Sequence, residues 1–196
     1  MEMFRPTRDG GASVRLSAGE ATLLRTLVVP VMELLGERGG VKDVKDARGA
    51  WDAKDDPSAV LDDLERIFEE ETPETPEDPV LARLLPDAYQ DDPEAAGEFR
   101  KYTESSLREA KKYFAQTLLD TLPPSGGKVK LTGDQARDWL RALNDIRLMF
   151  GVRLEVTEDF EDQLAALSPE DPKVAAFEVY GWLGAVQESL VQALAR

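Results

Sequence analysis

The side chains able to do chemistry in this chain are carboxylates, arginines and lysines, because neither histidine nor cysteine occurs among its 196 residues. Histidine, with an unperturbed pKa of about 6.5, is the usual proton-transfer group near neutral pH. Zinc sites of the Cys/His kind, Cys-His and Ser-His-Asp nucleophiles and thiol redox switches all need the missing residue types. The composition therefore favours a binding or regulatory protein, for which we expect no enzymatic activity and no cofactor.

One arginine is expected to face the core. A helix predicted over residues 133–150 places Arg147 on the same apolar stripe as Trp139. Because an unpaired buried charge is costly, Arg147 should have a carboxylate partner, and Asp87 and Glu98 are the candidates. The expected role is an internal ion pair that fixes how two helices dock. One alternative is an arginine that binds a ligand. Another is an enzyme that uses carboxylates or Arg147, and it predicts a concave pocket to which Arg147 is exposed.

The longest predicted helix carries the densest basic surface of an acidic protein. With 24 Lys and Arg against 39 Asp and Glu, the net charge of −15 opposes non-specific binding to nucleic acid or anionic lipid. Three occupants suit this basic face, namely DNA phosphates, an acidic partner or the chain's own stretch Glu69–Asp78, and the alternative is a solvated surface. The basic face comprises Arg100, Lys101, Arg108, Lys111 and Lys112. The inward face is predicted to comprise Phe99, Thr103, Ser106, Ala110, Phe114 and Thr117.

A mainly α, bundle-like single domain over 1–196, with a small N-terminal β-hairpin or minor sheet, is expected to position these residues. Asp9-Gly10-Gly11 lies between two short extended stretches, which predicts a hairpin over 1–16. Capping boxes at Ser17 and Thr132 start two of the helices. A candidate strand over 128–131 pairs with the hairpin. The predicted helices cover 17–36, 57–68, 92–122, 133–150 and 172–195.

Two further segments concern partners. Residues 39–55 and 69–79 are predicted to be acidic mobile linkers around helix 57–68, because they are rich in charge and poor in apolar side chains. The last helix is apolar on more than one face, as in a central helix or a dimer interface, so a homodimer is possible. Its candidate dimer residues are Phe177, Trp182, Val186 and Leu190. No stretch suits a signal peptide or a membrane span, so we expect a cytoplasmic protein without membrane contact.

Three motifs resemble one known family when they are taken together. They are DPVLARLLPDAY from Asp78 to Tyr89, Glu98-Phe99-Arg100, and WLRALNDIRL from Trp139 to Leu148 with Gly151 after it. Over nearly its whole length the chain resembles the actinobacterial domain-of-unknown-function family that includes the oxidative-stress transcriptional regulator AosR. The matching motif residues, expected to form a buried polar network that is structural or binds a partner, are Arg83, Asp87, Tyr89, Glu98, Arg100, Asn144, Asp145 and Arg147.

The resemblance implies a non-enzymatic cytoplasmic regulator that contacts a sigma factor or RNA polymerase in the response to oxidative stress. Thiol-based sensing belongs to that picture, and this chain departs from it because it has no cysteine. The alternative is a dimeric adaptor or structural interaction protein without a direct role in transcription. Direct DNA contact through the basic face is a further alternative, to which the net charge gives no support.

Overall fold

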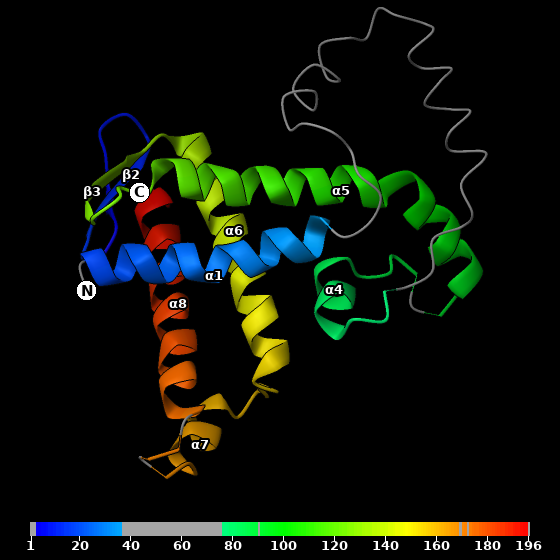
Figure 1. Ribbon diagram of the computed structural model, residues 1–196. Coiled ribbons are helices and arrows are strands. Elements are labelled where there is room, and N and C mark those ends of the chain that lie inside the picture. Colours follow the sequence, from blue (N-terminus) through cyan, green and yellow to red (C-terminus); the bar gives the residue numbers. More distant parts are fainter. Residues whose placement is uncertain (1–2, 37–75, 90, 169, 172, 196) are drawn as a thin grey trace, which may run out of the picture.

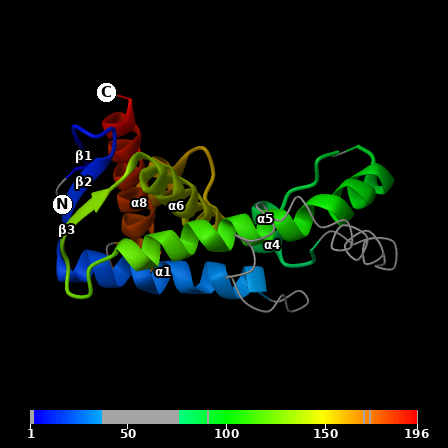
Figure 2. The same cartoon turned by 90° about the horizontal axis from the view of Figure 1, so that it is seen from above.

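Two pairs of antiparallel helices dominate the computed structural model, which describes residues 3–36, 76–89, 91–168, 170–171 and 173–195. Helix α1 (Ala18–Gly36) lies beside α5 (Pro93–Thr121), and α6 (Gly133–Arg153) lies beside α8 (Lys173–Leu194). The second pair crosses the first (Figures 1 and 2). Short helices α4 (Pro79–Leu84) and α7 (Phe160–Ala165) precede α5 and α8. The predicted mainly helical class is confirmed.

A small antiparallel sheet lies at one end of the first helix pair (Figure 1). Its order is β1 (Arg5–Pro6), β2 (Ala12–Leu16) and β3 (Gly127–Leu131). The first two strands form the predicted hairpin, and β3 pairs with it as expected. At Gly11 a Cβ atom would lie 2.0 Å from the carbonyl oxygen of Leu131, so glycine alone fits where the hairpin approaches β3.

The helices begin where their capping residues predict. In α1 the Ser17 hydroxyl accepts a hydrogen bond from the Glu20 N–H at 3.2 Å, and the Glu20 carboxylate accepts one from the Ser17 N–H at 2.7 Å. Thr132 and Gln135 form the same capping box at α6. Asp92 caps α5 by accepting from the Ala95 N–H at 3.0 Å. Each cap satisfies N–H groups that lack a partner within the helix.

Several boundaries differ from the predictions. Helix α6 continues past residue 150 to Arg153. Pro79, which the prediction places at the end of the linker 69–79, instead begins α4 directly after the cap Asp78. A proline behind a capping aspartate starts a helix, and that signal was missed. The predicted linker 39–55, helix 57–68 and residues 69–75 of the second linker lie outside the described residues.

Trp139 on α6 is at the centre of the core and has no exposed surface. Its indole contacts the ring of Phe4 edge to face at 5.9 Å, and its Nε1–H donates to the Thr121 hydroxyl at 2.8 Å. One side chain thus joins the N-terminal segment, the end of α5 and α6.

None of the described helices combines the length and the apolarity that crossing a bilayer requires.

Candidate functional site

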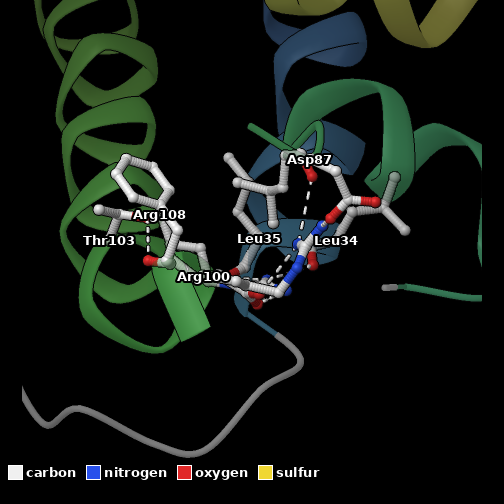
Figure 3. A network of polar contacts seen from close by, with 9 residues as sticks. Leu34, Leu35, Asp87, Arg100, Thr103 and Arg108 are labelled. Carbon is white, nitrogen blue, oxygen red and sulfur yellow. Dashed lines mark hydrogen bonds and ion pairs between the residues drawn. The ribbon is translucent and has the colours of Figure 1, made fainter. Parts of the chain in front are cut away.

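Helix α5 carries a buried network of charges along one stripe (Figure 3). The Arg100 guanidinium pairs with Asp87, donates to Glu104 at 3.1 Å and donates to the Leu85 carbonyl at 3.2 Å. Arg108 Nε donates to the other oxygen of Glu104 at 2.8 Å. Arg100 and Arg108 are 5% and 6% exposed, so we refer to Asp87, Arg100, Glu104 and Arg108 as the buried charge network.

The buried charge network ties two chain segments to α5. Arg108 donates to the Leu35 carbonyl at 3.2 Å and so satisfies an acceptor in the last turn of α1, where a cation is favourable (Figure 3). Arg100 fixes the segment after α4 through Leu85 and Asp87. Burial lowers the pKa of Arg100, but its hydrogen bonds to Asp87 and Glu104 outweigh burial and raise it. The guanidinium therefore remains charged inside the protein.

The prediction of an exposed basic face on this helix is wrong. Arg100 and Arg108 point into the protein, and Lys111 pairs with Asp145 of α6 at 2.6 Å. Lys101 and Lys112 are half-buried. The predicted inward face is wrong for two of its six residues, since Phe99 is 46% exposed and Ser106 is also exposed, while the other four are half-buried. The pattern Arg-x-x-x-Glu-x-x-x-Arg at 100–108 was the signal, because residues four apart share one helix face and these charges neutralise each other.

Lys111 and Asp145 form a second internal ion pair, between α5 and α6. Burial raises the pKa of Asp145 above its ordinary value of 3.8, although the hydrogen bond and charge of Lys111 act in the opposite direction. Asp9, in contrast, accepts hydrogen bonds from Thr7 and Lys130 in the exposed hairpin, and its pKa is lowered to about 2. The two aspartates therefore have opposite effects on stability as the pH changes.

We expect a ¹³C NMR titration of the side-chain carboxyls to place the Asp145 midpoint above 3.8 and the Asp9 midpoint near 2. Folded Asp145 keeps a proton that the unfolded chain has released, so its contribution to stability falls as the pH rises from 3.8 through its own pKa. Asp9 contributes stability above pH 3.8 that is lost as the pH falls towards 2. A midpoint for Asp145 below 3.8 would show that Lys111 outweighs burial.

Four residues predicted for the buried polar network are exposed, and their assignment to it is wrong. These residues are Arg83, Tyr89, Glu98 and Asn144. The structure brings together Asp87 and Arg100, while Asp145 belongs to the separate pair with Lys111. Glu104 and Arg108 belong to the network and were missed as its members. The residues predicted to form one buried polar network therefore belong to several separate sites in the structure.

An aromatic stripe lies exposed along α5. Tyr102 is 57% exposed, Tyr113 is 49% exposed, and Phe99 on the same side contacts the exposed Tyr89 edge to face at 6.0 Å. We define the aromatic stripe as Tyr89, Phe99, Tyr102 and Tyr113. Exposed aromatic side chains are residue types enriched in protein contact surfaces. Once the charged stripe is placed inside, helical spacing puts Phe99, Tyr102 and Tyr113 on the outside of α5.

Arg147 lines an open cleft and lacks the predicted carboxylate partner. Asp87 pairs with Arg100 and Glu98 is exposed, so both proposed partners were wrong. Within the part of the chain that the structure describes, Arg147 donates to the neutral Gln187 at 2.9 Å and to the Tyr180 hydroxyl at 3.5 Å. The cleft holds about 460 Å³ between α4, α6 and α8.

The assignment of α8 side chains to a dimer face is wrong for three of the four residues. Phe177, Val186 and Leu190 are buried in this chain's own structure, and Trp182 is half-buried against the core. Phe177 stacks on Phe160 of α7 at 5.7 Å. Helix α8 is apolar on more than one face because it packs against α6, against strands β1 and β2, and through Phe177 against α7. The homodimer therefore stays a prediction, and Phe177, Val186 and Leu190 no longer support it.

Comparisons with known proteins agree with the resemblance. A family model described as a domain of unknown function, DUF2017, matches residues 1–194. Proteins named "Oxidative stress regulator AosR" from Mycobacterium tuberculosis and Mycobacterium bovis are each 36% identical to the chain over 204 residues, which cover 96% of this chain and 84% of theirs. No solved structure matches the chain significantly.

Proposed function

Because this chain belongs to the DUF2017 family and resembles mycobacterial proteins named as oxidative stress regulators, we propose that it regulates the response to oxidative stress in the cytoplasm, without catalysis, by contacting a sigma factor or RNA polymerase. The aromatic stripe on α5 is the observation that carries the mode of action. Its aromatic side chains are the residue types enriched in protein interfaces.

Charge supports a protein partner over DNA. Three of the five cations once expected on a DNA-binding face are used inside the protein, by Asp87, Glu104 and Asp145. The net charge of −15 repels phosphates at longer range. An aromatic surface needs no positive field to bind a protein, because burial of apolar area stabilises the contact. Without cysteine, the signal reaches the protein through a partner or a ligand.

The aromatic stripe can be tested with a double variant. Tyr102→Ser with Tyr113→Ser is expected to weaken binding to purified RNA polymerase or to the cognate sigma factor by about 30-fold or more, since interface hot spots contribute about 2 kcal/mol or more. Binding is measured by biolayer interferometry against the core polymerase and each sigma factor of the host. Both tyrosines are exposed, so the free energy of unfolding should change little.

The matched control is Val29→Ser with Val191→Ser, which removes two exposed apolar side chains from α1 and α8. We expect this control to bind as the original chain does. Equal weakening by both pairs would show that the aromatic stripe is not the contact surface. Absence of binding to the polymerase and to every sigma factor at micromolar concentration would contradict the proposed function.

A further inference from the structure

We infer that the cleft around Arg147 binds a small organic anion, whose carboxylate or phosphate group meets the guanidinium groups of Arg147 and Arg83 and whose apolar part lies against Leu148, Val152 and Val156. All five residues line the cleft. Its volume of about 460 Å³ suits a metabolite-sized ligand. The site uses no residue of the aromatic stripe, so this inference does not rest on the proposed function.

The charge balance of the cleft favours an anion. Arg147 and Arg83 contribute two positive charges to the lining, and Glu155 is the single carboxylate among the lining residues. No ion pair of Arg147 or Arg83 is formed within the described residues. An arginine that is half-buried among neutral partners has lost hydration without gaining an opposite charge, so an oxyanion would compensate it.

The Arg147 side chain is fixed in place before any ligand arrives. One terminal nitrogen donates to Gln187 at 2.9 Å, and the guanidinium centre lies 5.1 Å from the centre of the Tyr180 ring. The flat face of the guanidinium lies over Gly184, where an added Cβ would be 3.8 Å from three of its atoms. Its Nε–H is buried and has no acceptor among the residues that the structure describes. A preorganised cation loses little conformational entropy when it binds.

Contacts with Phe160 of α7 and with Gly151 of α6 fix the Tyr180 ring beside the cleft. The Tyr180 ring contacts Phe160 of α7 at a centroid distance of 5.3 Å and packs closely over Gly151, where an added Cβ would be 3.7 Å from the ring. The apolar lining residues Leu148 and Val152 come from α6 one turn apart, and Val156 follows in the next segment. One region of the cleft therefore offers charge-assisted hydrogen bonds and another offers an apolar surface, which together fit an amphiphilic anion.

The test uses butyrate and butyl phosphate as probes, with butanol and butylamine as uncharged and cationic controls of similar shape. ¹H–¹⁵N NMR follows the Nε–H signal of Arg147, which is buried and therefore exchanges slowly with water. We expect saturable shifts of this signal with one or both anions, and none with butanol or butylamine. The anion with the lower Kd identifies the oxyanion that the site prefers.

Variants separate the site from general electrostatics. Arg147→Gln and Arg83→Gln are each expected to raise the Kd of the anion about 10- to 100-fold, because each removes charge-assisted hydrogen bonds. Arg83 is exposed, so its variant tests the site even where Arg147→Gln disturbs folding. The control Arg137→Gln removes an equal charge from the exposed side of α6 and should leave the Kd unchanged.

Three outcomes would overturn the inference. The first is the lack of a saturable shift with either anion at millimolar concentration. The second is an equal loss of affinity in Arg137→Gln and Arg83→Gln, which would mean that net charge alone attracts the anion. The third is an equal response to butanol, which would mean that the cleft is an apolar pocket without an anion site.

Discussion

Replacing Glu104 by alanine is expected to lower the free energy of unfolding by about 3–5 kcal/mol, because breaking a buried ion pair leaves uncompensated charge inside the protein. Glu104 accepts from both Arg100 and Arg108, so its loss affects two buried guanidinium groups at once. Urea denaturation followed by circular dichroism measures the loss. Glu104→Gln keeps the shape and an acceptor oxygen but not the charge, so it should give a smaller loss.

The matched control is Glu98→Ala, which removes an exposed glutamate from the same helix. We expect the free energy of unfolding to change by no more than about 0.5 kcal/mol. A second readout is local: in Glu104→Ala, Arg108 is no longer held against the Leu35 carbonyl, so hydrogen exchange in the last turn of α1 should accelerate. Equal stability losses in the Glu98 and Glu104 variants would contradict the buried charge network.

Replacing Trp139 by alanine should also lower the free energy of unfolding by about 3–5 kcal/mol, since it leaves a large cavity in the core. Thr121→Val preserves shape but leaves the indole N–H without its acceptor, at a cost of about 1–3 kcal/mol. It also removes the bond that the hydroxyl donates to the Thr117 carbonyl, which is already an acceptor within the helix. Val29→Ala changes an exposed side chain and serves as the control. No loss in Thr121→Val would show that the indole N–H does not depend on this hydroxyl.

Local signals in the sequence predicted the helix starts well. Ser17 and Thr132 cap their helices as expected, and the hairpin around Gly10 and its pairing with β3 follow from short-range turn chemistry. These features depend on residues within a few positions of each other, so one sequence suffices to recognise them. Helix α4 was missed because six residues are too few to show an amphipathic period.

The orientation of α5 was not predictable from hydrophobic periodicity. Its buried stripe contains Arg100, Glu104 and Arg108, which a hydrophobicity pattern assigns to solvent, and its exposed stripe contains Phe99, Tyr102 and Tyr113. The charges can be buried because Asp87 and the carbonyl groups of Leu85 and Leu35 complete their hydrogen bonds. Leu35 is 73 positions from Arg108, and Leu85 and Asp87 precede α5, so the partners come from separate segments and the sequence does not reveal which segments meet.

The site at Arg147 was half predictable. Helical spacing identified Arg147 as a cation on the inner side of α6, and the need for partners followed from the cost of burying it. The identity of the partners did not follow, since Gln187 and Tyr180 come from α8 and are neutral. The concave pocket at Arg147 that the enzyme alternative predicted is present, although a pocket by itself does not distinguish catalysis from ligand binding.

The two ends of the chain meet in the folded protein. The Phe4 N–H donates to the Ser189 hydroxyl at 3.4 Å across 185 positions of sequence. Strand β2 pairs with β3, which comes from the middle of the chain. Contacts this distant in sequence close slowly, because the loop entropy is lost before they form. During synthesis the N-terminal hairpin emerges long before β3 and α8, against which it packs. We therefore expect the native state to form only after α8 has left the ribosome. Truncation before Ser189 would remove the end of α8, which packs against β1 and α6, and expose apolar side chains of the core, so we expect such a chain to aggregate.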